Sequence, residues 1–341
     1  MNSRKLMYDT LEMCNHGRAP RDLWTLPWAT TRYGKEIDEI RRTFNMDYAG
    51  SPGFCREKTI AHGDDPYVRG VYVDDWGCEF INIHGGVIGE VKNPQVRDEE
   101  WDDADKVHIP RELLTIDVEK VNDYIRATPD VFHACGCCPR PFEQLQFIRG
   151  TADLYMDLMD PPPKMLRFME KMHAYYCELL EVWAKTDVDC LNFMDDWGSQ
   201  QALLIPPRIW RELFKPMYKD YIDIAHRAGK KIFMHSDGNT LEILPDLIEL
   251  GLDAINTQLF CIGVDKLAPF KGKITFWGEI CRQHLLPSGS LQDIENAVTQ
   301  VKETLWSNGG CIAQCEFGPG GRPENVRKVY ETWDALTNPS S

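Results

Sequence analysis

The 341-residue sequence lacks an apolar run long enough to cross a membrane, and its first residues lack the apolar segment of a secretory signal. It also lacks an excess of basic residues, since 53 acidic residues outnumber 38 basic ones and give a net charge of −15. A surface that binds nucleic acid or an anionic membrane needs a basic face. The sequence therefore predicts a cytoplasmic protein that binds neither nucleic acid nor membranes.

Common nucleotide and zinc-ribbon motifs are missing too. No G-x-G-x-x-G follows an early strand, and the Gly-rich segment 84–89 is followed by neither Lys-Ser/Thr nor a helix. The 12 cysteines include no two Cys-x-x-Cys pairs at zinc-ribbon spacing, so free thiols are expected in a reducing compartment. Their densest cluster, Cys135-Gly136-Cys137-Cys138, is typical of buried thiols at a strand end, with metal binding or redox chemistry as the alternative.

What the sequence does contain is a regular alternation of short apolar strands and amphipathic helices, with short links between them. Strands are predicted at 131–134, 188–194, 230–235, 253–258, 274–279 and 310–318, and helices at 141–149, 164–185, 207–228, 241–250, 291–306 and 323–336. This alternation indicates βαβ units and a parallel sheet. Since a (β/α)8 barrel needs about 250 residues, we expect one TIM-barrel domain over residues 1–341.

The N-terminal part is less regular. Helices are predicted at 7–14 and 34–44, a first strand at 18–28, and a hairpin at 71–83 that turns near Trp76-Gly77. We expect residues 1–70 to form a helical and hairpin extension that caps the barrel.

Titratable residues follow the predicted strands, and the active site of such a barrel lies at the C-terminal ends of its strands. The residues in these positions are Asp195, Asp196 and Trp197, then His235 and Asp237, then Asn256 and Gln258, then Glu279 and Cys281, then Cys315 and Glu316. Thiolate, imidazole and carboxylate are zinc ligands, although a set of solvated loop acids is the alternative. We predict a zinc site.

The ligands that we predict are His235, Glu279 and Cys315, with Asp237 either a fourth ligand or the partner that orients His235. Cys281 and Glu316 are the alternative zinc ligands. Because alternate residues of a strand face opposite sides, Cys315 and Glu316 are not expected to bind the same ion.

Aromatic and amide side chains near the strand ends suggest a substrate pocket. Trp76 and Trp197 both lie in Asp-Asp-Trp-Gly sequences, which places them as predicted pocket walls. Asn256, Gln258 and Phe317 complete the predicted substrate-binding set. An aromatic-lined pocket that reaches a zinc ion suits a neutral or aromatic organic substrate.

Several segments resemble the uroporphyrinogen decarboxylase superfamily. They are Asp74–Cys78, Leu191–Gly198, Phe233–Gly238, Leu244–Asn256, Thr275–Ile280 and Pro323–Val326. The resemblance is good from about residue 185 onward and implies a (β/α)8 barrel. It also implies one of two activities, namely metal-free decarboxylation of uroporphyrinogen or zinc-dependent methyl transfer that involves corrinoid proteins.

The decarboxylase alternative fits the sequence less well. True decarboxylases carry an N-terminal Arg-Gln-Ala-Gly-Arg-Tyr motif that binds substrate carboxylates, and the stretch 28–33 retains only Arg32-Tyr33. An acid-rich site would also repel a tetrapyrrole with many carboxylates.

The methyltransferases carry His-x-Cys on the central strand and a later Cys. Asp237 stands where the first of those cysteines would be, and a carboxylate makes zinc harder and better suited to an ether oxygen. The resemblance thus implies the substrate-side enzyme of an O-demethylase, which moves the methyl group of a methoxylated aromatic to the cob(I)alamin of a partner corrinoid protein. Asp196 or Asp195 would orient ring substituents, and Tyr33 or His284 would supply a proton.

Two other functions stay open at this point, a uroporphyrinogen-type decarboxylase and a non-catalytic barrel that binds small molecules. The sequence leaves the oligomeric state open, with a homodimer among the alternatives.

Overall fold

The computed structural model describes residues 2–63 and 65–338, and its centre is one sheet of eight parallel strands. In spatial order these strands are β1 (Arg21–Thr25), β11 (Cys311–Phe317), β10 (Thr275–Trp277), β9 (Ala254–Thr257), β8 (Lys231–Ser236), β7 (Cys190–Met194), β6 (Phe132–Ala134) and β2 (Tyr48–Gly50). The edge strands meet, because the backbone N–H of Asp47 donates to the carbonyl of Arg21 at 2.9 Å. The Asp47 carboxylate in turn accepts the Arg21 N–H at 2.8 Å. This nearly closed barrel confirms the predicted (β/α)8 architecture.

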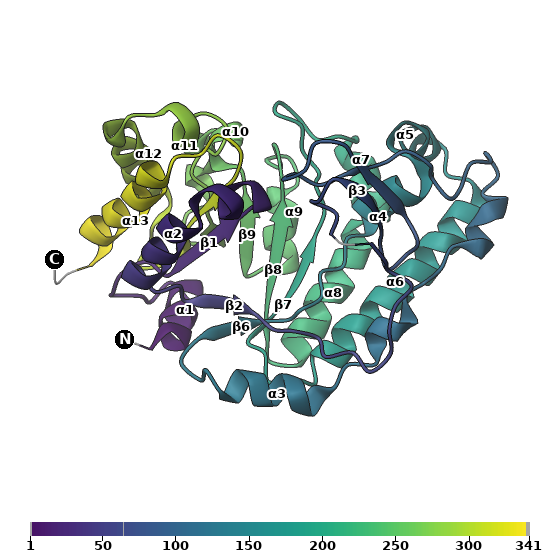
Figure 1. Ribbon diagram of the computed structural model, residues 1–341, viewed down its shortest axis with the longest axis horizontal. Helices are drawn as coiled ribbons and strands as arrows, with labels where there is room; N and C mark the ends of the chain where they lie inside the picture. Colours follow the sequence, from purple (N-terminus) through teal and green to yellow (C-terminus); the bar gives the residue numbers. More distant parts are fainter. Residues whose placement is uncertain (1, 64, 339–341) are drawn as a thin grey trace.

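Helices surround the strands, with α6 and α8 on one side and α12 and α13 on the other in Figure 1. The helices are α1 (Ser3–Leu11), α2 (Pro27–Thr43), α3 (Val118–Arg126), α4 (Pro141–Arg149), α5 (Thr151–Met159), α6 (Pro163–Trp183), α7 (Pro207–Leu213), α8 (Lys215–Arg227), α9 (Leu244–Leu250), α10 (Leu259–Ile262), α11 (Leu285–Ser288), α12 (Leu291–Leu305) and α13 (Pro323–Thr337). Several begin at proline, whose fixed φ suits the first turn and whose missing N–H is not needed there. Among the described residues, no helix is both long and apolar enough to cross a membrane.

The N-terminal third differs from the expected extension. The predicted hairpin at 71–83 is present as β3 (Gly70–Val73) and β4 (Glu79–Asn82), and β5 (Glu90–Val91) completes a small antiparallel sheet. Residues 1–70 do not form an extension outside the barrel, because this segment contains β1 and β2, two of the eight barrel strands. β2 has only three residues, too few for an apolar period to mark it in the sequence.

Each barrel strand divides its side chains between the barrel interior and the helical shell. In β11, Cys311, Ala313 and Cys315 belong to the core beneath the helices, whereas Ile312 belongs to the interior cluster with Phe233 of β8. In β8, His235 lies two residues after Phe233 and therefore shares its face. This alternation decides which residues at the strand ends can reach a common site.

Candidate metal centre at the barrel mouth

Two glycines bring the loops after β7 and β8 together. A Cβ atom on Gly238, which has a φ of +78°, would lie 2.0 Å from the carbonyl oxygen of Gly198, so only glycine allows this approach. The backbone N–H of Gly198 donates to the Asp237 carbonyl at 3.1 Å, and the N–H of Asp237 donates to the Asp196 carboxylate at 2.9 Å. These bonds hold the two loops together and fix the Asp196 carboxylate beside Asp237.

The resulting cluster consists of Asp196, His235 and Asp237, with one ligand atom of each lying within 4.8 Å of the others. His235 Nε2 is 3.5 Å from Asp196 Oδ1 and 3.7 Å from Asp237 Oδ1. The three side chains come from the ends of two adjacent strands, where barrel active sites lie. We call this group the inner triad.

Asn256, at the end of β9, orients the imidazole of the inner triad. Its Oδ1 lies 2.7 Å from His235 Nδ1, and its Nδ2 donates to the Trp277 carbonyl at 2.5 Å. The second bond fixes which end of the amide is the oxygen, so His235 Nδ1 must carry the hydrogen that Oδ1 accepts. His235 Nε2 is then left with a lone pair directed at the two carboxylates, as in a metal-ligating histidine.

Three more glutamates surround the inner triad. Burial, together with the charges of Asp196 and Asp237, raises the pKa of Glu143 to about 7 although Arg140 and His235 oppose the shift. Burial also raises the pKa of Glu279 to about 8 and that of Glu316 above its ordinary value. The site therefore gathers several carboxyl groups whose charged forms are disfavoured by burial and by mutual repulsion.

Arg282 is the main compensating charge on one side of the inner triad. Its guanidinium donates to the Asp237 carboxylate and lies 3.1 Å from Glu316 and 3.5 Å from Glu279. These contacts leave Asp237 Oδ1 free, because the guanidinium binds the other oxygen, Oδ2.

The inner triad fits a divalent cation. Asp237 Oδ1 and Glu143 Oε2 are both buried and have no hydrogen-bond partner, and buried carboxylate oxygens are normally satisfied. An imidazole nitrogen and carboxylate oxygens are acceptable ligands for zinc and for harder first-row metals. A cation held by Asp196, His235 and Asp237 would satisfy Asp237 Oδ1 and reduce the repulsion among the acids.

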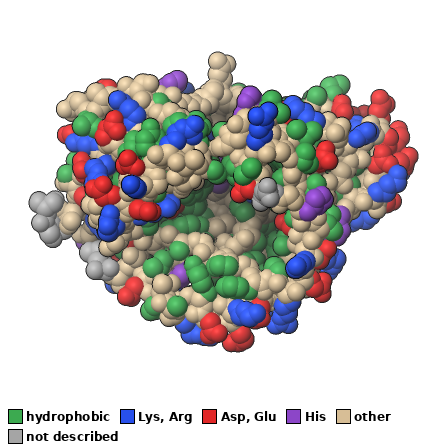
Figure 2. All heavy atoms as spheres, in the orientation of Figure 1, with side chains coloured by type: hydrophobic (Ala, Val, Ile, Leu, Met, Phe, Trp, Pro, Cys, Tyr) green, Lys and Arg blue, Asp and Glu red, His purple; other side chains and the backbone are tan. Residues whose placement is uncertain are grey.

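A cavity of about 530 Å³ adjoins this acidic cluster. Arg140 belongs to its wall, and the Arg140 guanidinium lies 3.7 Å from the Glu143 carboxylate. Many of the other lining side chains are aromatic or thiol-bearing, including Tyr67, Trp76, Cys138, Tyr175, Tyr176 and Trp183, while Asp74, Asp75 and Gln144 contribute polar groups. The face drawn in Figure 2 is hollowed near its centre, with hydrophobic side chains in the hollow and charged ones around it.

Two residues that we predicted at the site lie in the core instead. Asp195 is fully buried and accepts hydrogen bonds from the Tyr218 hydroxyl at 2.6 Å and the Glu143 N–H at 2.8 Å. Trp197 is fully buried, stacks on Phe142 at 4.1 Å and donates to the Tyr218 hydroxyl. Asp195 therefore positions α4, and Trp197 fills the core rather than a pocket wall.

Cys315 is not brought to the inner triad. Its thiol faces the helical shell, 3.6 Å from the Tyr330 hydroxyl of α13, and it is fully buried. Since β11 alternates, its neighbour Glu316 faces the barrel interior and reaches the site. The prediction of Cys315 as a ligand was therefore wrong, because its thiol faces the shell. Glu316, the alternative ligand, is the residue of this pair that lies near the inner triad.

Phe317 and Tyr33 also lie apart from the inner triad. Phe317 is buried on the same face of β11 as Cys315, and Tyr33 of α2 stacks on it with ring centroids 5.5 Å apart. This pair joins α2 to the barrel wall. We predicted that Tyr33 transfers a proton and that Phe317 binds substrate, whereas in the structure both side chains have a packing role.

Of the remaining residues that we predicted at the site, three line cavities and one, His284, lies in an exposed loop. Trp76 is buried against Tyr175 and Tyr176 and lines the large cavity. Gln258 and Cys281 line a much smaller pocket beside Arg282 and Glu279, where Gln258 Oε1 is buried without a partner. His284 is exposed, just before α11.

The cysteine cluster after β6 forms a short thiol pair. Cys135 and Cys137 have sulfur atoms 3.6 Å apart, and the backbone N–H of Asn192 donates to the Cys135 sulfur. Cys137 and Cys138 line the large cavity, so these thiols belong to its wall. They are not among the described groups that could hold a metal.

Sequence reasoning missed three charged residues of the site, Arg140, Glu143 and Arg282. Arg140 and Glu143 follow β6, and the rule that polar residues at strand ends form the site would have found them had it been applied to that strand. Arg282 directly follows Cys281 after β10, and it was passed over because an arginine in a loop is usually solvated.

Comparisons with known proteins agree with this architecture. A methyltransferase from Methanosarcina mazei superposes with a TM-score of 0.67 at 13% identity, covering 98% of this chain and 99% of its own, and shows that the two share a fold. A B12-independent methionine synthase from Shewanella sp. W3-18-1 matches more weakly, with a TM-score of 0.47 at 9% identity over 94% of this chain and 96% of its own.

A search of curated proteins found no matching relative. The family model described as uroporphyrinogen decarboxylase (URO-D) matches residues 73–336, which is well over half of the sequence. The chain belongs to the URO-D family.

Proposed function

We propose that this protein is a zinc-dependent methyltransferase that moves the O-methyl group of a methoxylated aromatic compound to the cob(I)alamin of a partner corrinoid protein. The observation that carries the proposal is the inner triad, in which His235 Nε2 and a buried, unpartnered Asp237 oxygen converge at the barrel mouth. Asp196 completes the set of residues that would hold the ion.

Zinc bound there would supply a Lewis acid that polarises the ether oxygen and stabilises a phenolate. The donor set supports this chemistry because it contains imidazole and carboxylates and no thiolate, which leaves the metal more acidic than a thiolate-rich site would. Methyl transfer then breaks the bond between the methyl carbon and the ether oxygen, and the bonding pair stays on that oxygen. The methyl carbon passes to the cobalt of the partner, and the phenolate takes a proton once it reaches water.

The protein's own residues would bind and orient the reactants. Asn256 holds the His235 ring so that Nε2 faces the site, and Arg282 holds Asp237 by its second oxygen. Fixing the ligands in advance means that little reorganisation is needed during the reaction. Glu143, whose Oε2 is buried and unpartnered, would be a further ligand or a hydrogen-bonding group.

The lining of the 530 Å³ cavity favours the proposal of an aromatic substrate. Four tyrosines and two tryptophans contribute to its lining, and its volume of about 530 Å³ lies within the range of pockets that bind small organic molecules. Aromatic walls favour a planar ring through stacked or edge-on contacts. Arg140 is placed to face an anionic or hydrogen-bonding ring substituent at the end of the cavity nearest Glu143.

A methyl transfer assay with free cob(I)alamin and a panel of methoxybenzenes tests the proposal. We expect loss of the cob(I)alamin absorbance and release of the matching phenol with at least one member of the panel, in zinc-loaded protein only. Zinc-loaded protein that demethylates no member, yet releases carbon dioxide from uroporphyrinogen, would support the decarboxylase instead. Tight binding of an aromatic without turnover would support a non-catalytic barrel.

A further inference from the structure

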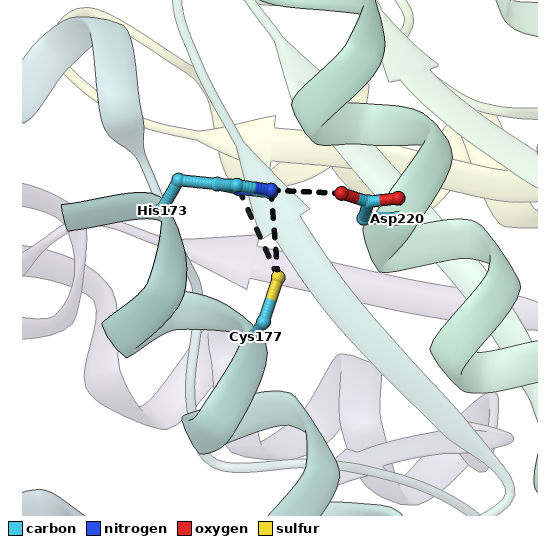
Figure 3. A group of neighbouring side chains, drawn as sticks. All are labelled: His173, Cys177 and Asp220. Atoms are coloured by element: carbon cyan, nitrogen blue, oxygen red, sulfur yellow. Dashed lines mark hydrogen bonds and ion pairs between the residues drawn. The ribbon is translucent and has the colours of Figure 1, made fainter. Parts of the chain in front are cut away.

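A second group of potential ligands lies outside the barrel, between two helices of the shell. His173 and Cys177 are four residues apart on α6 and therefore share one helix face, and Asp220 projects toward them from α8 (Figure 3). The part of the chain that the structure describes contains this group and the inner triad as its potential metal-binding groups. We call it the outer triad.

The spacing of the outer triad is close to that of a zinc site. Cys177 Sγ lies 3.7 Å from His173 Nε2, and Asp220 Oδ2 lies 2.9 Å from the same nitrogen. In a tetrahedral zinc site, ligand atoms at ordinary bond lengths are roughly 3.3–3.6 Å apart. All three ligand atoms lie within 4.8 Å of one another, so side-chain adjustments would bring them around one ion. Asp220 is exposed and can adjust, since 56% of its side chain is accessible.

The other nitrogen of His173 is also partnered. Its Nδ1 lies 3.4 Å from the hydroxyl of Tyr221, which is buried between the same two helices. A tyrosine hydroxyl can donate or accept, so it can serve either tautomer of the imidazole. With the hydrogen on Nδ1, His173 would present a lone pair on Nε2 toward Cys177 and Asp220, which is the arrangement found behind zinc-binding histidines.

We propose that the outer triad is a structural zinc site that joins α6 to α8, with His173 Nε2, Cys177 Sγ and an Asp220 oxygen as protein ligands and water in the fourth position. It takes a soft-to-borderline divalent cation because it contains a thiolate, whereas the inner triad does not. Binding replaces the His173–Asp220 contact with bonds from both residues to the ion, and it releases to solvent both the thiol proton and the proton that His173 Nε2 shares with Asp220. The site stabilises the shell and does not take part in the reaction.

The thiolate gives this site a spectroscopic signature of its own. We would add cobalt(II) chloride to metal-free full-length protein and record the thiolate-to-cobalt charge-transfer absorption in the near ultraviolet. Wild type and His235→Ala should both show this band at one thiolate-bound cobalt per chain, whereas Cys177→Ser should lack it. Cys261→Ser, which removes another partly exposed thiol, is the matched control and should keep the band.

Zinc titration with a thermal melt gives a second readout. Zinc should raise the melting temperature of His235→Ala, in which the inner triad is broken, and Asp220→Asn at the exposed ligand should weaken that response by at least roughly tenfold in zinc concentration. A charge-transfer band that survives in Cys177→Ser, or none in wild type, would overturn the proposal. Because every expected signal persists in His235→Ala, failure here is distinct from failure of the proposed methyl transfer.

Discussion

The inner and outer triads each combine one histidine with carboxylate, yet they are built differently. The inner triad comes from the ends of two strands, is backed by Asn256 and lies among buried acids. One of these acids, Glu143, contacts Arg140 in the wall of an aromatic cavity. The outer triad comes from helix faces and includes a thiol, and its histidine already pairs with its own aspartate. From this difference we propose that the inner triad, with unpartnered atoms near a cavity, serves chemistry, and that the outer triad, with partnered atoms between two helices, serves stability.

The proposed difference in role between the two triads is tested most decisively by replacing one histidine at a time. His235→Ala should reduce methyl transfer by more than about 100-fold, since even loss of a residue behind a ligand costs roughly 10–100-fold. His173→Asn should leave methyl transfer unchanged and lower the melting temperature of zinc-loaded protein. Assays of both variants at matched zinc concentration measure this, and equal losses of activity would show that the two triads do not differ in role.

The residue behind the inner histidine should have the next largest effect. Asn256→Ala removes the acceptor that holds His235 Nδ1–H, so we expect zinc affinity to fall by roughly 10–100-fold. Asn256→Asp keeps an acceptor at the same place and should retain most of the affinity. Competition with a chromogenic chelator measures both variants. Equal affinities of the alanine variant and wild type would mean that Asn256 does not orient a ligand.

Much of this fold could be predicted from the sequence. The boundaries of α4 match the predicted helix, because Pro141 and Gly150 mark its two ends, and the six later strands lie where short apolar runs predicted them. The helix expected at 207–228 is divided at Phe214. β2 escaped notice because pairing with β6, rather than any pattern of its own three residues, makes it a strand.

The residues of the site were less predictable, because the sequence does not show which side chains face the barrel interior and which face the helical shell. Alternation shows that Cys315 and Glu316 face opposite sides, but only packing against Tyr330 decides which of them faces the shell. Trp197 lies in a loop-like sequence and is nevertheless buried, because Phe142 and Tyr218 enclose it. The strand-end rule predicted His235 and Asp237 as metal ligands and Asp196 as a residue that orients ring substituents, and the structure brings these three side chains together.

Disrupting the contact between Gly238 and Gly198, which joins the two loops of the inner triad, should have the third largest effect, a loss of stability. Gly238→Ala forces a Cβ against the Gly198 carbonyl and should destabilise the protein by more than the roughly 1–2 kcal/mol that a positive φ costs by itself. Gly229→Ala is the matched control, since Gly229 has a φ of +70° with open space around it. Urea unfolding compares them, and equal losses would show that the close approach is not required.

The buried acids around the inner triad should give the smallest effect, a dependence of stability on pH. Burial raises the folded-state pKa of Glu279 to about 8, above the ordinary 4.5 of the unfolded chain. Between these values the folded state binds more protons, so the free energy of unfolding of metal-free protein should fall as pH rises through this window.

Glu279→Gln should flatten part of this dependence, whereas Glu99→Gln, at an exposed position, should not. Urea unfolding of metal-free protein at a series of pH values measures the slope. An unchanged slope in Glu279→Gln would mean that this carboxyl does not titrate in the window.

The most direct test of the account uses the Cys177→Ser variant, in which the inner triad is the intact potential metal-binding group among the described residues. Metal-free variant should show no transfer of methyl groups from methoxybenzenes to cob(I)alamin, and one equivalent of zinc per chain should restore it. Full activity in the metal-free variant would contradict the claim that the inner triad is a catalytic metal site.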